Sequence, residues 1–342
     1  MRLLFVGFGT VGQGLAELFL GKKEFLSKKY GFDPVVVGIS DELKGSALNA
    51  DGIDLQEALD LVKAGTSLCE IKNSRFDGDA VSLINAAEAD VMLEATYTNI
   101  KTAEPATAHI KAALGKGMHV VTTNKGPLAL NYLELDKIAR EKGVKFLFEG
   151  TVMSGTPIIN LIRETLAGSD ILEIKGILNG TTNYILTRME EGLAYEEALK
   201  KAQELGYAEA VPDADVLGWD ALAKVTILAT VFFGASADPF DYPCEGITGI
   251  TASAIADAKN RGKRFKLIGK VWRERDYVKA SVGPEEVDLT HPLASVLGAT
   301  NAVTVTTDTL GDVTIVGAGA GKIETGFSML SDLLHIAVHA NK

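Results

Sequence analysis

The stretch with the most chemical potential is acidic and lies directly before an uncharged run. Residues 209–224 hold four carboxylates and one lysine, namely Glu209, Asp213, Asp215, Asp220 and Lys224. The apolar residues 225–233 that follow contain no charge. Asp220 and Lys224 are four residues apart, so on a helix they share one face.

This spacing leaves two interpretations of the Asp220–Lys224 pair. An exposed ion pair stabilises a helix by about 0.2–0.5 kcal/mol and needs no further role. A helix that is apolar all round after Lys224 is instead expected to be buried, which brings the ammonium to the edge of a core. Such surroundings lower the pKa of a lysine and suit it to proton transfer. Catalysis by Lys224 is therefore a hypothesis beside the structural one.

A glycine-rich turn near the amino terminus has the pattern of a dinucleotide-binding fingerprint. An apolar strand at residues 2–6 runs into Gly7, Phe8, Gly9, Thr10, Val11 and Gly12, before an amphipathic stretch. Gly7 permits the tight turn, Gly9 lets the backbone approach a pyrophosphate, and Gly12 allows close helix–strand packing. The anion would lie on the free amides at the start of the helix. The order strand, turn, helix favours nucleotide binding over a chance glycine turn.

Elements that could position these residues recur in α/β order. Apolar strands are predicted at residues 35–39, 91–93, 119–121 and 146–148, with helical stretches such as 105–114 and 133–142 between them. The order predicts a doubly wound, mostly parallel Rossmann-type sheet. Strands at 173–177, 277–282 and 303–306 predict a second, mixed α/β domain.

We expect two domains. Residues 1–149 form the dinucleotide-binding domain, completed by residues 317–342, whose helix at 322–340 packs on it. Residues 150–316 form a domain for substrate binding, catalysis and dimerisation, although residues 282–310 carry no functional signal of their own.

Polar residues just past the strands are expected to line the ligand edge of the first sheet. They are Ser40, Asp41, Thr96, Asn124, Lys125 and Glu149. Asp41 could accept from a ribose hydroxyl, which favours NAD, whereas Ser40 and Lys44 could hold the 2′-phosphate of NADP. Asp41 could also merely cap a turn. The gap from Gly12 to Asp41 is long because the first helix is expected to be extended by residues 21–31.

Composition narrows the class of protein. The 342 residues include 34 basic and 45 acidic ones, a net charge of −11 without a basic block, so a nucleic-acid partner is not expected. No uncharged apolar stretch is long enough to cross a bilayer, and no secretory signal is evident, so we expect a cytoplasmic protein without a membrane partner. Cys69 and Cys244 lie far apart, which predicts neither a disulfide scaffold nor a structural zinc site.

With these segments in order, the chain resembles the homoserine dehydrogenase family over essentially its whole length. The segments are residues 7–12, 94–96, 119–127, 149–157, 176–186, 209–224 and 317–321. The Asn-Gly-Thr-Thr-Asn-Tyr-Ile-Leu run at 179–186 and the Gly-x-Asp-x-x-x-Lys run at 218–224 are more specific than the glycine fingerprint. The resemblance implies NAD(P)-dependent interconversion of L-aspartate 4-semialdehyde and L-homoserine, on the route to threonine, methionine and isoleucine, by an enzyme expected to be a homodimer.

The resemblance also implies roles for single residues. Lys224 matches the proton donor to the aldehyde oxygen, with Asp220 and Lys125 as further catalytic residues. Glu209, Asp215, Asp220 and Lys125 are implied for substrate binding, and Thr96, Lys125, Gly319 and Gly321 for the cofactor, beside residues 7–12, Ser40 and Asp41. A monovalent cation, sodium or potassium, is implied at Glu149 and the backbone carbonyls of Val152, Ser154 and Thr156. One carboxylate beside free carbonyls suits a hard cation.

Plainer interpretations and rival functions remain at this point. Glu149 could cap the next helix, Lys125 could be a solvated surface lysine, and the late glycine run could be another phosphate turn or a flexible hinge. An acylating semialdehyde dehydrogenase would need an activated cysteine, for which neither cysteine has the local sequence. A nucleotide-sensing module would not need the Lys224 segment. A regulatory domain or fused kinase, found in some family members, is not expected in a chain that ends at Lys342.

Overall fold

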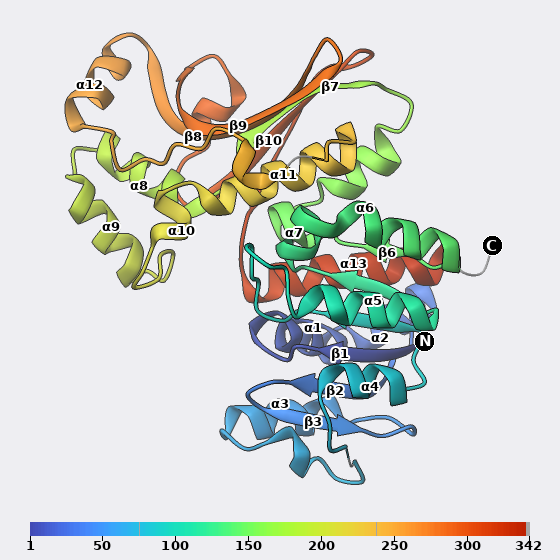
Figure 1. The fold of residues 1–342 in the computed structure, drawn as a ribbon. Helices are drawn as coiled ribbons and strands as arrows, with labels where there is room; N and C mark the ends of the chain where they lie inside the picture. The colour runs from blue at the N-terminus through green and yellow to red at the C-terminus, as the bar shows by residue number, and fades with distance from the viewer. Residues whose placement is uncertain (75, 237, 340–342) are drawn as a thin grey trace. The chain divides into compact units, whose positions relative to one another are not determined.

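The structure, a computed structural model, describes residues 1–74, 76–236 and 238–339. Two compact units share the chain, and each has its own sheet (Figure 1). The first unit comprises Met1–Gly155 and the chain from Gly321 onward, and the second comprises Thr156–Ala320. The sequence predicts the boundaries after residues 149 and 316. The contacts place them at 155 and 320, so Gly319 falls in the second unit and Gly321 in the first.

The first unit is built on a six-stranded sheet with the order β3-β2-β1-β4-β5-β6. Its strands are β1 Arg2–Val6, β2 Val35–Asp41, β3 Gly45–Leu48, β4 Val91–Glu94, β5 His119–Thr122 and β6 Phe146–Leu147. All neighbours pair in parallel except β2 and β3, which are antiparallel. Leu3, Phe5, Val91 and Leu93 are completely or almost completely buried, as expected where helices cover both faces. The predicted Rossmann-type sheet is confirmed.

Most helices of the first unit connect these strands. They are α1 Thr10–Gly21, α2 Lys23–Tyr30, α3 Leu55–Lys63, the short turn η1 Leu68–Glu70, α4 Ala80–Ala86, α5 Ala106–Lys116 and α6 Lys125–Lys142, whereas α7 Gly150–Met153 follows the last strand and α13 Lys322–His339 comes after the second unit. The expectation of one extended first helix was wrong. The chain leaves the helical conformation at Lys22, and α2 is a separate helix that ends at Gly31, whose φ is +60°. Ala340, the last residue of the predicted final helix, lies outside the described residues.

Helix α13 packs closely against α1, so both ends of the chain meet in this unit. A Cβ at Gly14 would lie 2.2 Å from the Lys322 carbonyl oxygen, and one at Gly326 would lie 2.7 Å from the Leu15 nitrogen. Glycine therefore lets the two backbones approach at each point. Lys322 and Glu17 add an ion pair across the contact at 2.6 Å.

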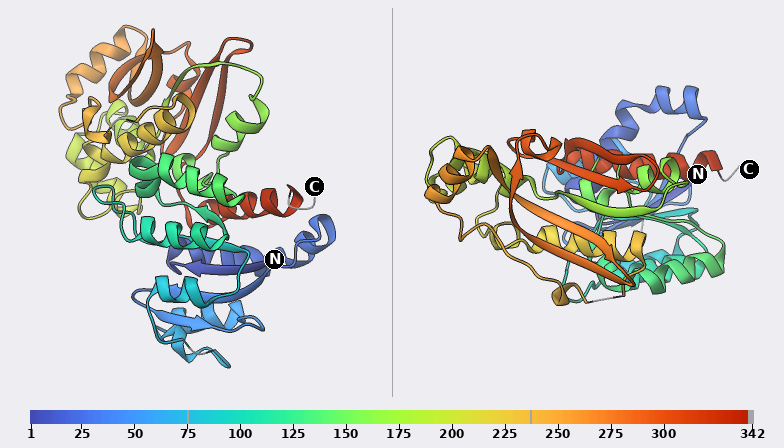
Figure 2. Two further views of the ribbon diagram at one scale, coloured as in Figure 1. Left: turned by 45° about the vertical axis from the view of Figure 1, so that its right-hand side comes forward. Right: turned by 90° about the horizontal axis from the view of Figure 1, so that it is seen from above.

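The second unit is built on an antiparallel five-stranded sheet with the order β11-β10-β7-β8-β9. Its strands are β7 Ile171–Ile177, β8 Lys263–Glu274, β9 Tyr277–Asp288, β10 Thr300–Thr307 and β11 Gly311–Ala318. Figure 2 shows β8 and β9 as a long hairpin. Residues 282–310, which the sequence left without a role, supply the end of β9 and all of β10.

Helix α11, Trp219–Phe233, packs on β8 and β9 and carries Lys224 (Figure 1). It is buried along most of its length, as its uncharged sequence predicts. Helix α8, Gly180–Glu190, begins after β7. The remaining elements are η2 Leu161–Thr165, α9 Tyr195–Glu204, α10 Asp213–Val216, η3 Pro239–Asp241, α12 Ala252–Asn260 and η4 Pro292–Ser295.

None of the helices in the described parts of the chain is both long and apolar enough to span a membrane.

Candidate active site

The glycine turn after β1 is packed against other backbone atoms at Gly7 and Gly12, and it is open at Gly9. The Gly7 amide donates to the Ser40 carbonyl at 2.7 Å, and Gly7 has a left-handed φ of +94°. A Cβ there would lie 2.5 Å from the Ala95 carbonyl carbon, and one at Gly12 would lie 2.7 Å from the Gly7 oxygen. A Cβ at Gly9 would meet no atom within 4 Å. Open space at Gly9 fits a backbone that approaches a pyrophosphate.

The start of α1 offers its amides to such an anion. Gly9 precedes the helix and has no side chain, so the first amides are not capped by a side chain. Thr10 is exposed and Val11 is half-buried at the first turn, whereas the Phe8 ring is buried. The Phe8 side chain therefore belongs to the core, and its backbone amide contacts a neighbouring polar group.

That group is Asp41, the residue predicted to accept from a ribose hydroxyl. Its Oδ2 accepts a hydrogen bond from the Phe8 amide at 2.8 Å. Its Oδ1 accepts from the Leu43 amide and from Lys44 Nζ, each at 3.1 Å. Asp41 thus caps the turn after β2, as the plainer interpretation required, and in addition holds the glycine turn. The Ser40 hydroxyl is buried and accepts from the Ser46 hydroxyl at 2.9 Å, inside the β2–β3 pair.

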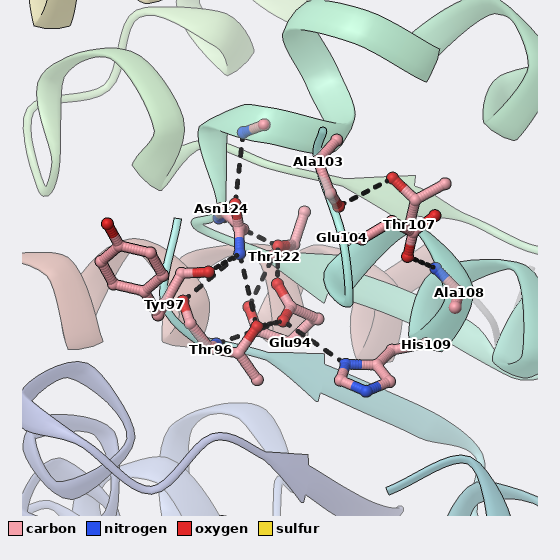
Figure 3. Close-up of polar contacts among 11 residues, drawn as sticks. Glu94, Thr96, Tyr97, Ala103, Glu104, Thr107, Ala108, His109, Thr122 and Asn124 are labelled. Atoms are coloured by element: carbon pink, nitrogen blue, oxygen red, sulfur yellow. Dashed lines mark hydrogen bonds and ion pairs between the residues drawn. The ribbon is translucent and has the colours of Figure 1, made fainter. Parts of the chain in front are cut away.

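Thr96 and Lys125 follow neighbouring strands, β4 and β5, at the same edge of the sheet. Lys125 is half-buried and is the first residue of α6, whose amino-terminal cap is Asn124. The side-chain amide of Asn124 donates to the Tyr97 carbonyl at 3.2 Å and to the Thr96 carbonyl at 3.3 Å (Figure 3). The structure therefore joins the segment of Thr96 to the residue before Lys125.

In the second unit, Lys224 is enclosed. Its residue surface is 7% exposed, and Nζ donates to the Asp220 carboxylate at 2.6 Å and to the Leu178 carbonyl at 2.7 Å. The Asp220 side chain is 17% exposed. This is the buried interpretation of the i,i+4 pair; the pair does not lie on a solvated helix face. Two oxygens fix the ammonium in one place.

Asn179 extends this cluster to a second carboxylate. Its Nδ2 donates to Asp215 at 2.6 Å and to Asp220 at 3.0 Å. Its Oδ1 accepts from the Thr182 amide at 2.9 Å, so the same side chain caps α8. Lys224, Asp220, Asn179 and Asp215 thus form one connected group, which we call the Lys224 cluster. No role for Asn179 was predicted, although an asparagine before Gly-Thr-Thr is a recognisable helix cap.

Asp215 is the member whose titration is most altered by its place in the cluster. Burial raises the pKa of its carboxyl above the ordinary 3.8, and the nearby Asp220 charge raises it further. The hydrogen bond from Asn179 and the Lys224 ammonium act in the opposite direction. Two carboxylates of one sign that face one ammonium are suited to a second cation.

Glu209 lies apart from these bonds. The residue is exposed, and its carbonyl accepts from Gln203 Nε2 at 3.1 Å. The loop that carries it precedes α10, whose first residue is Asp213. The Glu209 side chain is therefore on the surface of this unit, unlike Asp215 and Asp220.

The predicted cation loop contains one buried carboxylate and an unusual turn. Glu149 is 1% exposed, and its side chain does not cap α7, which it precedes. Val152 is buried on α7, and Ser154 ends this helix with a φ of +52°, rare for a residue with a side chain. Thr156 is the first residue of the second unit, where its hydroxyl donates to the Ala318 carbonyl at 3.0 Å.

A search for metal sites rich in ionisable ligands gives no candidate. Among the described residues, no group of three or more His, Cys, Asp or Glu could hold a metal ion. A monovalent cation on one carboxylate and several carbonyls would not form such a group.

The late glycine turn is tightly constrained within each unit. A Cβ at Gly319 would lie 2.1 Å from the side-chain amide of Asn301, in the second unit. Gly321, in the first unit, has a φ of +139°, and its carbonyl accepts from Thr325 on α13. These glycines are required by close packing, which differs from the flexible hinge considered above.

Comparison with known proteins agrees with this geometry. The family model for the homoserine dehydrogenase NAD-binding domain matches residues 7–149, and the homoserine dehydrogenase model matches residues 157–334. The chain is 43% identical to the NAD(+)-dependent homoserine dehydrogenase of Pseudomonas canavaninivorans, over 100% of this chain and 97% of that protein. It is 45% identical to the homoserine dehydrogenase of Methanocaldococcus jannaschii, over 98% of each.

A solved structure extends the agreement to three dimensions. A hyperthermophilic archaeal homoserine dehydrogenase in complex with NADPH superposes with a TM-score of 0.82 and 32% identity, covering 97% of this chain and 96% of that one. The two family models together span both units, and identity above 40% extends along whole relatives. The chain therefore belongs to the homoserine dehydrogenase family, the NAD(P)-dependent oxidoreductases that interconvert L-aspartate 4-semialdehyde and L-homoserine.

Proposed function

We propose that Lys224 transfers the proton at the substrate oxygen in this reaction. The observation that supports the role is the enclosed Nζ, held by Asp220 and the Leu178 carbonyl. When bound, the reduced cofactor would supply a hydride to the aldehyde carbon, and the aldehyde oxygen would then gain negative charge. An acid positioned at that oxygen lowers the barrier, typically by a factor of about 10²–10⁴. In the reverse direction the neutral amine accepts the hydroxyl proton of homoserine.

Asp220 would stabilise the ammonium and orient it without exchanging the proton itself. The pH dependence of homoserine oxidation tests this division of roles. Oxidation requires Lys224 as a base, so the part of its pH dependence that depends on this base should disappear in Lys224→Ala. A pH dependence of the same shape in Lys224→Ala would assign the base to another group.

The remaining members of the site are proposed to hold the ligands. Asp215 and Asp220, with the exposed Glu209, would receive the substrate ammonium, because carboxylates are its natural partners. Lys125 would lie close to both the substrate and the nicotinamide, and Thr96 would contact the cofactor. Support comes from the position of both residues at the carboxyl edge of the sheet, where such folds bind ligands.

We propose that the enzyme uses both nicotinamide cofactors, with less than about a hundredfold preference, since the two charges at the end of β2 have opposite effects. The relatives support use of either, because one is named NAD(+)-dependent and another binds NADPH. Asp41 attracts a ribose hydroxyl, and Lys44, its ion-pair partner at 3.1 Å, attracts a 2′-phosphate. Asp41→Ala should raise the KM for NAD more than the KM for NADP. Equal losses with both cofactors would remove Asp41 as the ribose ligand.

A monovalent cation is proposed at Glu149 and the carbonyls of Val152, Ser154 and Thr156. The buried Glu149 carboxylate and the left-handed Ser154 support it, because strained backbone concentrates at functional turns. Glu149→Ala should weaken cofactor or substrate binding in buffers with sodium or potassium and abolish the dependence on cation. An unchanged dependence on cation in this variant would exclude the site.

A homodimer is proposed through the sheet of the second unit. The face of this sheet that is turned away from α11 is the more polar one. It carries Glu173, Lys175, Lys270 and Thr314. Light scattering of the purified protein should give twice the mass of one chain, and a single-chain mass would exclude the dimer. The cytoplasmic location expected from the sequence stays a prediction.

A further inference from the structure

We infer that Glu94 and Asn124 are positioning residues that hold Thr96 and Lys125 in the arrangement required for the reaction. The inference rests on the roles proposed above for Thr96 and Lys125. It assigns a use to a buried carboxylate and a buried amide that the proton-transfer step does not employ.

Glu94 ends β4 and has no exposed surface. Its Oε1 accepts from the Thr96 amide at 3.1 Å and from the Thr96 hydroxyl, and its Oε2 accepts from the Thr122 hydroxyl at 3.0 Å (Figure 3). Oε1 also lies 3.9 Å from Nδ1 of the buried His109. An ionised carboxylate is an acceptor only, so one group can fix several donors at once.

Asn124 links the segment after β4 to the end of β5 and the start of α6. The Thr122 hydroxyl, which donates to Glu94, accepts a hydrogen bond from the backbone amide of Asn124 at 3.0 Å. The Asn124 side chain donates to the carbonyls of Thr96 and Tyr97, and its Oδ1 accepts from the Gly126 amide at 3.2 Å. One side chain thus both caps α6, which begins at Lys125, and ties that start to the segment after β4.

Close packing at the same place makes the arrangement rigid. A Cβ at Gly126 would lie 2.6 Å from the Asn99 carbonyl oxygen and 3.1 Å from the Ala103 Cα. The segment after β4 therefore lies directly on the first turn of α6. A shift of this segment would move Thr96 and the start of α6 together, and displacements of about 1 Å can cost about a hundredfold in rate.

Two substitutions at Asn124 distinguish its role as the cap of α6 from its hydrogen bonds to the Thr96 and Tyr97 carbonyls. Asn124→Asp and Asn124→Ser both keep a good amino-terminal cap, but neither can donate to both carbonyls as the amide does. Aspartate adds a charge and serine does not, so agreement between them excludes an effect of charge alone. We expect each variant to lower kcat/KM by at least about tenfold at temperatures where it is folded, although loss of the buried hydrogen bonds also lowers its melting temperature.

The matched control is Thr107→Val. Thr107 is a buried residue of the same region whose hydroxyl donates to the Ala103 carbonyl at 3.0 Å and makes no bond to Glu94 or Asn124 (Figure 3). This variant should lose stability and keep kcat/KM. Glu94→Gln, which retains one acceptor oxygen, should fall between wild type and Glu94→Ala if the latter folds.

A double-mutant cycle with Lys125→Ala gives the decisive readout. If Asn124 acts through Lys125 and Thr96, most of its effect should disappear in the Lys125→Ala background, leaving only the part that acts through Thr96, whereas a merely structural loss would add in full. Additive losses overturn the inference, as do Asn124 variants within about twofold of wild type while Lys125→Ala and Thr96→Val are impaired. If Lys125→Ala and Thr96→Val are themselves normal, the proposed roles fail and the inference fails with them.

Discussion

Two lysines of the second unit are buried to a similar degree but have different partners. Lys224 is 7% exposed and Lys266 is 1% exposed. Lys224 is held by a carboxylate and a carbonyl, whereas Lys266 donates to two uncharged oxygens, Asn183 Oδ1 at 2.8 Å and the Val296 carbonyl at 2.5 Å. Burial lowers the pKa of Lys266 to about 8, and the neighbouring Arg264 charge contributes.

The difference teaches that burial and a shifted pKa do not by themselves identify a catalytic lysine. Lys266 has a clearly lowered pKa, yet its bonds fasten α8 to the segment before β10. Lys224 is part of a cluster in which Asp220 binds the ammonium and Asn179 links Asp220 to a second carboxylate, Asp215. A cation brought by a substrate could join that cluster, because it holds more negative than positive charge. The neutral oxygens around Lys266 offer no such site.

The largest expected effect is on catalysis by Lys224. Lys224→Ala should lower kcat by at least about a hundredfold with cofactor binding near wild type, because the proton donor is lost. Lys224→Arg should also fail in homoserine oxidation, since guanidinium does not act as a base near neutral pH. Steady-state rates and cofactor titration by fluorescence measure the two quantities. Near-normal turnover of Lys224→Ala would reduce the Asp220–Lys224 pair to a structural one.

Removal of the charged partner should have a smaller effect. Asp220→Ala and the isosteric Asp220→Asn should lower kcat by roughly tenfold, since Lys224 keeps the Leu178 carbonyl but loses its counter-charge. The comparison with Lys224→Ala is made under the same conditions. A loss in Asp220→Asn as large as that in Lys224→Ala would show that Asp220 takes part in the proton transfer itself.

The raised pKa of Asp215 should appear in substrate binding. The substrate ammonium favours the ionised carboxylate, so the KM for homoserine should increase as pH falls through the pKa of Asp215, which burial places above 3.8. Asp215→Asn should raise KM at neutral pH and remove this part of the pH dependence. KM profiles that coincide in the two proteins would exclude Asp215 from ammonium binding.

Lys266 should affect stability, and only weakly affect turnover. Its pKa is about 8 in the folded protein and 10.5 in the unfolded one, so between these values the unfolded chain binds more protons. The free energy of unfolding should therefore rise with pH across this window, relative to Lys266→Met, by about 1 kcal/mol per pH unit. Urea unfolding at pH 7 to 9.5 measures it. Parallel curves for the two proteins would contradict the depressed pKa.

The sequence predicted most of the first sheet and the Asp220–Lys224 pair, for identifiable reasons. Strands such as β1 and β4 are short apolar runs in regular α/β order, and the glycine turn has a backbone requirement that no other residue meets. Strand β3 was missed because Gly45–Leu48 has no β-branched or aromatic residue to indicate it. The break between α1 and α2 was missed because Lys22 gives no local signal.

Contacts distant along the chain limited prediction of the site. The Asp220–Lys224 pair follows from helical spacing, but Asn179 lies 41 residues before Asp220, and tertiary packing alone brings them together. The same holds for Lys266, which lies among the charged residues of Lys263–Glu274 and therefore has the sequence of an exposed strand. Its burial depends on Asn183 and Val296, which belong to other parts of the chain.

The close packing of α13 on α1 has a consequence for how the protein is made. A ribosome delivers α13 after the whole second unit, so that unit can fold while the nucleotide-binding core still lacks its last helix. The glycines that let the two helices touch, Gly14 and Gly326, are separated by nearly the full chain. A chain interrupted before Lys322 would therefore carry the Lys224 cluster but lack the helix that packs on α1, the helix that follows the glycine turn.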